Sequence, residues 1–290
     1  MIVLPGPASP DLAERLAAEL EIDVVPLVFK KFPDGENYIR IKGDVAAEDV
    51  VIVQTTSPPQ DERLMQLFLT ASAAKNQGAR GITAVVPYLA YSRQDKIFLP
   101  GEAFSVRTIV NLLETCGVHR ILTVNAHNPE ALKSLVLPVR DLSAIPLLAT
   151  HFKDQGYERA VALSMGKKGA ATADEAAKVL QGPSDYIPTK RDRHTGKVTI
   201  EEKRLPVKDR VAIIFDDIIS SGGTMVKAVA HTKKQGAAQV YAACVHPLLM
   251  NDARERIMRS GAEDIVGTDS VPSPASVVCV APLIAEALME

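Results

Sequence analysis

The feature that most constrains the fold is a strand-like run that ends in two acidic residues and leads directly into a helix. Residues 211–217 read V-A-I-I-F-D-D, and residues 218–224 read I-I-S-S-G-G-T. The apolar run predicts a buried strand, and residues 225–235 have the spacing of a helix. Glycine lets the backbone approach a ligand and a helix N-terminus favours an anion, so this stretch predicts a phosphate site in an α/β protein.

The candidate phosphate loop and the acidic pair before it indicate a ligand with both a phosphate and hydroxyl groups. The loop residues are Ser220, Ser221, Gly222, Gly223 and Thr224. Their backbone N–H groups and hydroxyls suit an anion, whereas Asp216 and Asp217 would repel a bare phosphate. Carboxylates at this position suit ribose hydroxyls or a magnesium ion. From these residues alone, a chance strand-to-helix turn is the alternative.

Strand-like and helical segments alternate along the 290 residues, 47% of them hydrophobic, which predicts an α/β fold with a full core. The predicted strands are residues 2–4, 24–28, 38–41, 50–54, 82–87, 120–124, 160–163, 186–187, 211–215, 239–244, 264–266 and 277–280. The predicted helices are residues 10–20, with Ser9 as N-cap, 61–77, 104–115, 144–155, 169–180, 225–235, 252–259 and 282–289. Residues 190–204 are highly charged and predict a mobile hairpin or flap.

Charge and cysteine content exclude several classes of protein. A net charge of −2 and a pI near 6.3 give no general attraction to nucleic acid or to an anionic membrane. No window reaches transmembrane length and no basic leader is present, so we expect a cytoplasmic protein. Three widely spaced cysteines without a C-x-x-C pair argue against a disulfide framework or a structural zinc site.

Two polar clusters in the first half are further candidates for ligand binding. Residues 91–96, Y-S-R-Q-D-K, follow the predicted strand 82–87 at its carboxyl end, where open α/β sheets bind ligands. Arg93 has the fork geometry to hold phosphate oxygens, and Gln94 has a donor and an acceptor for a base edge. Residues 32–36, F-P-D-G-E, form a plain turn when taken alone. Each cluster by itself is equally consistent with an exposed loop.

Taken together, the motifs resemble those of ribose-phosphate diphosphokinases, also called phosphoribosyl pyrophosphate synthetases. F-P-D-G-E, Y-S-R-Q-D-K, N-A-H-N-P-E at 125–130, K-R-D-R at 190–193 and F-D-D-I-I-S-S-G-G-T at 215–224 occur in that family's order and spacing. The match runs over essentially the whole chain, and its compact length resembles the archaeal branch. The resemblance implies two type I phosphoribosyltransferase-like domains, each a mainly parallel sheet flanked by helices.

The resemblance also implies domain boundaries and a reaction. We expect an N-terminal ATP-side domain of residues 1–143, with the C-terminal helix 281–290 packing back on it. A ribose-5-phosphate-binding domain of residues 144–280 would carry a flap at 188–204. The expected reaction transfers the β,γ-diphosphoryl group of ATP to the C1 hydroxyl of ribose 5-phosphate with Mg²⁺, giving phosphoribosyl pyrophosphate and AMP. The expected partners are the two substrates and further copies of the chain, as a dimer or higher homo-oligomer, with no nucleic acid and no membrane.

Roles for individual residues follow from the resemblance. The residues implied to contact ATP are Asp34, Gly35, Glu36, Arg93, Gln94 and His127, of which His127 also lies at the metal. Ribose 5-phosphate is implied to bind Asp216, Asp217, Ser220, Ser221, Gly222, Gly223 and Thr224. The flap residues implied to stabilise charge on the transferring group are Lys190, Arg191 and Arg193.

The chain departs from the family pattern at three places. The family places an arginine two positions after the flap lysine, but Asp192 stands there if Lys190 is that lysine. Asn125 replaces an aspartate two residues before the histidine, and S-M-G-K-K-G at 164–169 lacks an aspartate before the glycines. The lysines in this segment could bind phosphate directly. The alternatives are a weakened or inactive regulatory homologue, or an ordinary phosphoribosyltransferase, in which F-P-D-G-E and S-R-Q-D-K have no role.

Overall fold

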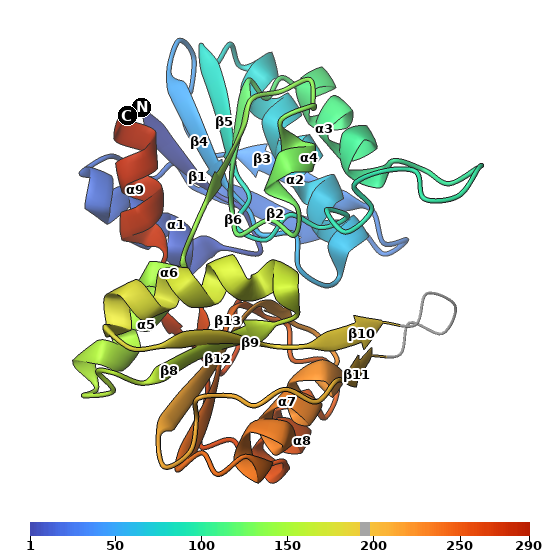
Figure 1. Cartoon of the computed structure of the whole chain (residues 1–290). Coiled ribbons are helices and arrows are strands. Elements are labelled where there is room, and N and C mark those ends of the chain that lie inside the picture. Colours follow the sequence, from blue (N-terminus) through green and yellow to red (C-terminus); the bar gives the residue numbers. More distant parts are fainter. Residues whose placement is uncertain (192–197) are drawn as a thin grey trace. The chain divides into compact units, whose positions relative to one another are not determined.

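The computed structural model describes residues 1–191 and 198–290, with side chains for 1–190 and 199–290. Within these residues the chain forms two compact units (Figure 1). Unit 1 comprises Met1–Ser143 together with Cys279–Glu290, and unit 2 comprises Ala144–Val278. Each unit has its own buried apolar core.

The centre of unit 1 is a five-stranded sheet of order β1-β4-β5-β6-β7, in which every neighbouring pair is parallel. Its strands are β1 Ile2–Pro5, β4 Asp49–Val53, β5 Gly81–Val85, β6 Arg120–Val124 and β7 Val139–Leu142. The four residues after Asp49 are all buried. A nearly continuous apolar sequence is what a strand covered on both faces requires.

Helices and one hairpin complete unit 1. The helices are α1 Pro10–Leu20, α2 Gln60–Asn76, α3 Ser105–Thr115, α4 Pro129–Leu132 and α9 Ala281–Met289. The last of these, α9, packs against α1 and β7 (Figure 1). Arg140 of β7 donates from Nη1 to the carbonyl oxygen of Ala287 at 3.2 Å. The antiparallel hairpin of β2 Leu27–Lys31 and β3 Asn37–Ile41 contacts α2.

Unit 2 is built on a six-stranded parallel sheet of order β15-β14-β13-β12-β8-β9. Its strands are β8 Val161–Met165, β9 Ser184–Ile187, β12 Val211–Ile219, β13 Gln239–Pro247, β14 Ile265–Thr268 and β15 Ser276–Val278. The helical segments are α5 Ile145–Asp154, the short 3-10 helix Lys167–Gly169, α6 Ala170–Leu180, α7 Gly223–Lys234 and α8 Ala253–Arg259. A short antiparallel hairpin joins β10 Thr189–Arg191 to β11 Val198–Ile200.

The predicted fold class is confirmed, since both sheets are parallel and flanked by helices. Within the described residues, three elements were not predicted: the one-turn helix α4, the 3-10 helix Lys167–Gly169 and the strand β7. The sequence V-R-D-L of β7 places two charged residues in a short strand at the edge of the sheet, so it lacks the apolar run of a central strand. The predicted end of β12 was also wrong, because this strand continues beyond residue 215 to Ile219.

Candidate active site

The acidic pair lies at the carboxyl edge of the unit 2 sheet. β12 pairs with β8 as far as Phe215, which faces Ser164, and with β13 as far as Ile219. Asp216 and Asp217 therefore extend past the last partner on β8, and both are half-buried. Ligands of open parallel sheets bind beyond the carboxyl ends of central strands. The sheet thus presents two carboxylates where a ligand can reach them.

Local hydrogen bonds fix the direction of both carboxylates. The N–H of Asp217 donates to Asp216 Oδ1 at 3.0 Å, and the N–H of Ile218 donates to Asp217 Oδ1 at 2.9 Å. Burial, reinforced by the negative charge of Asp216, raises the pKa of the Cys244 thiol on the neighbouring strand β13. Cys244 is therefore a neutral core residue, and the acidic pair provides the local charge.

The loop after β12 offers a row of backbone donors. Within the described residues, none of the N–H groups from Ser220 to Thr224 donates a hydrogen bond to the protein. The last two of these groups belong to the first turn of α7, which has no acidic residue in that turn and no side-chain cap. The N-terminus of a helix carries a partial positive charge. An anion bound here would therefore receive several N–H donors and a favourable dipole.

Glycine is required at one position of this loop and permitted at the next. Gly222 has φ +74°, and a Cβ there would lie 3.1 Å from Ala253 Cβ and from Ile257 Cδ1. A side chain would therefore be strained by the backbone and crowded by α8. A Cβ on Gly223 would meet nothing within 4 Å. The first turn of α7 therefore has open space beside Gly223.

The turn between β8 and α6 contributes cations instead of acids. Gly166 has φ +68°, and Lys167 and Lys168 follow it as exposed side chains in the short 3-10 helix. The hydroxyl of Ser164 is buried and, among the described residues, finds no hydrogen-bond partner. It lies 2.9 Å from the place of a Cβ on Gly169, so only a glycine fits above it. Because β8 is the neighbour of β12, two positive charges stand at the same sheet edge as the acidic pair.

In unit 1, Arg93 and Gln94 follow β5 at the carboxyl edge of the sheet. Arg93 is exposed and Gln94 is half-buried, and the N–H of Gln94 donates to the carbonyl oxygen of Tyr91 at 3.1 Å. The side chain of Asn128, which follows β6, donates to the carboxylate of Asp95. This bond ties the segment after β5 to the segment after β6. Two of the sequence motifs therefore meet at one edge.

His127 is exposed and stands in the segment that follows β6. Asn125, at φ +41°, donates its N–H to the carbonyl oxygen of Leu142 at 2.8 Å. The N–H of Ala126 donates to Asp141 Oδ1 at 2.8 Å. Burial raises the pKa of Asp141 to about 7, against a lowering effect of this hydrogen bond. Sequence reasoning missed Asp141, because β7 was not recognised and nothing in the sequence connects residue 141 with residue 126.

Asp34, Gly35 and Glu36 lie on the tip of the β2–β3 hairpin and are all exposed. Gly35 has φ +98°, and the N–H of Phe32 donates to the carbonyl oxygen of Glu36 at 2.8 Å to close the turn. The hairpin is a two-stranded sheet of its own, outside the main sheet of unit 1. These three residues therefore stand on a separate hairpin that packs against α2, and not at the strand ends that carry Arg93 and His127.

The three flap residues are described to different extents. Lys190 is exposed on β10, opposite Thr199 of β11. Arg191 ends β10, and its side chain lies outside the described part of the chain. Arg193 lies outside the described residues altogether. The catalytic assignment of these residues therefore stays a prediction.

Across residues 1–191 and 198–290, no three His, Cys, Asp or Glu side chains gather in a group that could hold a metal ion. Mg²⁺ is usually held by one or two carboxylates together with substrate phosphates and water, so it does not need such a group. The half-buried pair Asp216 and Asp217 supplies oxygen ligands of that kind. The residues present thus fit a magnesium ion that arrives with a phosphorylated substrate.

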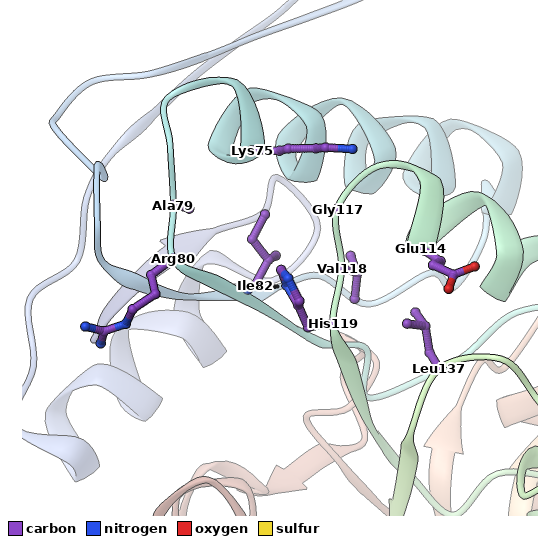
Figure 2. A pocket seen from close by; sticks show the side chains of 9 residues that line it. All are labelled: Lys75, Ala79, Arg80, Ile82, Glu114, Gly117, Val118, His119 and Leu137. Carbon is purple, nitrogen blue, oxygen red and sulfur yellow. Dashed lines mark hydrogen bonds between the residues drawn. The ribbon is translucent and has the colours of Figure 1, made fainter.

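A cavity of about 470 Å³ in unit 1 lies elsewhere (Figure 2). It is at the amino ends of β5 and β6, where Ile82 and His119 line it, and none of the predicted site residues does. The N–H of Ile82 donates to His119 Nδ1 at 3.1 Å, and Lys75 Nζ donates to the carbonyl oxygen of Thr115 at 3.1 Å. Its polar groups therefore already serve the fold, and the cavity is at the wrong edge for a ligand of a parallel sheet.

The fold and the site define a two-unit α/β protein of the phosphoribosyltransferase class, with a candidate anion-binding loop beside two carboxylates. Residues 143–280 match the phosphoribosyl transferase domain, and residues 1–117 match the N-terminal domain of ribose phosphate pyrophosphokinase. The chain belongs to the ribose-phosphate pyrophosphokinase family. It is similar over almost its whole length to proteins of that name from archaea.

The ribose-phosphate pyrophosphokinase of Methanopyrus kandleri is 38% identical over 99% of this chain and 98% of its own length. That of Saccharolobus solfataricus is 38% identical over 93% of both chains. The crystal structure of phosphoribosylpyrophosphate synthetase from Mycobacterium smegmatis is 28% identical, with a TM-score of 0.88 over 99% of this chain and 97% of that one. The resemblance predicted from the motifs is confirmed, and nothing in these comparisons favours an inactive homologue.

Proposed function

We propose that this chain is a ribose-phosphate diphosphokinase, which makes phosphoribosyl pyrophosphate and AMP from ATP and ribose 5-phosphate. The observation that carries the proposal is the row of N–H groups from Ser220 to Thr224, which donate to nothing in the described part of the chain, beside two carboxylates. One ligand that suits both is a sugar phosphate. The full-length similarity to proteins named ribose-phosphate pyrophosphokinase supports the same reaction.

In this proposal the 5-phosphate of the sugar binds the loop Ser220, Ser221, Gly222, Gly223 and Thr224. The backbone N–H groups and the α7 dipole hold its charge, and the hydroxyls of the two serines and the threonine add donors. Asp216 and Asp217 accept hydrogen bonds from the ribose hydroxyls. The orientation of both carboxylates by neighbouring N–H groups supports this role.

The reaction joins the C1 oxygen of the sugar to the β-phosphorus of ATP. The bond between that phosphorus and the oxygen bridging to the α-phosphorus breaks, AMP leaves with the bridging oxygen, and the hydroxyl proton is lost. Two anionic substrates must approach each other, so positioning and neutralisation of charge dominate the catalysis. Magnesium, when bound with the nucleotide, supplies positive charge to the phosphate oxygens. Lys190, Arg191 and Arg193 would add charge from the flap.

ATP would bind Arg93, Gln94 and His127, with His127 also near the metal. The hydrogen bond between Asn128 and Asp95 supports a common site for these segments. Asp34, Gly35 and Glu36 would reach the nucleotide of a neighbouring copy; their exposure at the tip of a hairpin separate from the main sheet supports this. The proposal thus includes a homo-oligomer of two or more chains.

The proposal assigns to the lysines after β8 part of the role of the aspartate that the family has there. Lys167 and Lys168 stand at the edge shared with Asp216. They would bind the diphosphate directly and replace part of the charge that a metal at an aspartate supplies.

The proposal also includes a cytoplasmic location. Within the described residues, the structure has no helix of the length and apolarity needed to span a membrane.

The test is to incubate the full chain with ATP, Mg²⁺ and ribose 5-phosphate and to measure AMP and phosphoribosyl pyrophosphate. We expect both products in equal amounts, and a loss of about 100-fold or more in turnover for Asp216→Asn. Asp264→Asn is the matched control, since Asp264 Oδ1 also accepts the following N–H, at 2.8 Å, but precedes β14 at the opposite edge. Binding of ATP without either product would contradict the proposal and favour a regulatory homologue.

A further inference from the structure

Three consecutive carbonyl oxygens, the last of β12 and the first two of the phosphate loop, are held by one other segment of unit 2. The N–H of Leu249 donates to the oxygen of Ile219 at 3.0 Å, and the N–H of Met250 donates to the oxygen of Ser220 at 3.0 Å. The third oxygen, that of Ser221, accepts from Nη2 of Arg256 on α8. We call residues 249–256 the support segment. The first two bonds come from backbone, so Arg256 is the member that mutation can remove.

These bonds decide where the donors of the loop point. In a trans peptide, the C=O of one residue and the N–H of the next point in opposite directions. Because the oxygens of residues 219–221 face the support segment, the N–H groups of residues 220–222 face away from it. Those are among the N–H groups that donate to nothing within the described residues. The support segment therefore orients the anion-binding side of the loop.

α8, whose first residues belong to the support segment, also lies directly against the loop. A Cβ on Gly222 would be 3.1 Å from Ala253 Cβ and Ile257 Cδ1, so the backbone of the loop already touches this helix. Arg256 is half-buried, and its Nε lies 3.0 Å from Asp252 Oδ1 without making a hydrogen bond. Asp252 and the carbonyl of Ser221 thus restrain the guanidinium from two sides.

We propose that Arg256 is a positioning residue for the phosphate of ribose 5-phosphate, acting through the carbonyl of Ser221. It does not touch the phosphate. Its Nη2 holds the peptide between Ser221 and Gly222 so that the N–H of Gly222 faces the ligand, and its charge, partly offset by Asp252 at 3.0 Å, lies behind the loop. This inference rests on the proposed binding of ribose 5-phosphate to the loop.

The test compares Arg256→Met and Arg256→Lys with the native chain in steady-state kinetics. For Arg256→Met we expect KM for ribose 5-phosphate to rise about 10-fold, with KM for ATP and kcat within about 2-fold, since one oriented donor and one nearby charge are lost. Arg256→Lys keeps the charge but not the fork, so we expect an intermediate rise in KM. Arg254→Gln is the control, because Arg254 is on the same helix and pairs with Asp264 at 3.6 Å.

Each result decides a different question. Equal KM values for Arg256→Met and Arg254→Gln would overturn the role of Arg256. A parallel rise in both KM values with a lower melting temperature would reduce Arg256 to a structural residue and overturn it too. If Arg256→Met does not fold, Arg256→Lys decides in the same way. Removing the three loop hydroxyls together, by Ser220→Ala, Ser221→Ala and Thr224→Val, tests the underlying assignment, since an unchanged KM for ribose 5-phosphate in that variant would contradict binding at the loop, whatever Arg256 does.

Discussion

Burial of the Asp141 carboxyl makes the stability of unit 1 depend on pH. Burial raises its pKa from the ordinary value of 3.8 to about 7, against a smaller lowering effect of the Ala126 N–H. The folded chain therefore keeps this proton over a range in which the unfolded chain has lost it. The carboxyl has no effect on stability below about pH 4, reduces it progressively between about pH 4 and 7, and has a constant unfavourable effect above that.

The size of the effect follows from the shift. One pKa unit corresponds to about 1.4 kcal/mol. A shift of about three units therefore lowers the free energy of unfolding by at most about 4 kcal/mol. The side chain is partly exposed, and solvent screening reduces the effect to about half of this. Asp141→Asn removes the charge and keeps an oxygen for the Ala126 N–H. As pH increases from about 5 to about 7, we expect the free energy of unfolding of this variant to rise by about 1 to 2 kcal/mol relative to that of the native chain.

The assay is urea unfolding in metal-free buffer, followed by far-UV circular dichroism from about pH 5 to about pH 8. Asp44→Asn is the matched control, because Asp44 Oδ1 also accepts a backbone N–H, that of Ala46 at 2.9 Å, but its carboxylate is exposed. We expect no such rise for this variant. A difference between Asp141→Asn and the native chain that stays level with pH, or shrinks as pH rises, would refute the reasoning.

Three further changes test other parts of the structure. Gly222→Ala should lower the free energy of unfolding by about 1 to 2 kcal/mol in thermal denaturation, since φ is +74° and α8 is in contact, whereas Gly223→Ala should not. Replacing Lys167 and Lys168 together by Gln should raise the Mg²⁺ concentration needed for half-maximal rate several-fold, and an unchanged requirement would show that the lysines do not meet the diphosphate. Removal of residues 281–290 should lower the melting temperature by several degrees and increase binding of a hydrophobic dye, because α9 covers α1 and β7. An unchanged melting temperature would contradict this.

Sequence reasoning succeeded where one segment carries the whole signal. The strand, acidic pair and glycine loop after residue 211 are contiguous, so their grouping at a sheet edge follows from the order of residues. It failed at β7, where Arg140 and Asp141 hide a short edge strand. Ser9 is the N-cap of α1, as predicted, but its hydroxyl makes no capping hydrogen bond within the described residues. The hydroxyl of Ser9 instead accepts the N–H of Thr55 at 2.8 Å, a long-range bond that local sequence does not reveal.

For the same reason, sequence reasoning did not identify Arg256 and Asp141, which contact the segments of the candidate site. Arg256 is an ordinary basic residue on a short amphipathic helix, and its contact with Ser221 spans 35 residues. Asp141 likewise depends on a contact with Ala126 across 15 residues. Motifs identify groups that face a ligand, because those groups lie close together in the chain. The residues that orient such groups come from other elements, and only tertiary structure brings them together.

Unit 1 is built from two stretches of the chain that are separated by unit 2, and this has a consequence for its biosynthesis. Unit 2 is the single stretch Ala144–Val278, whereas unit 1 combines Met1–Ser143 with Cys279–Glu290. Unit 1 therefore cannot form its contact between α1 and α9 until residues that follow the whole of unit 2 have been made. A truncation after Val278 would thus damage the unit whose first strand begins at Ile2 and leave every residue of the later unit in place.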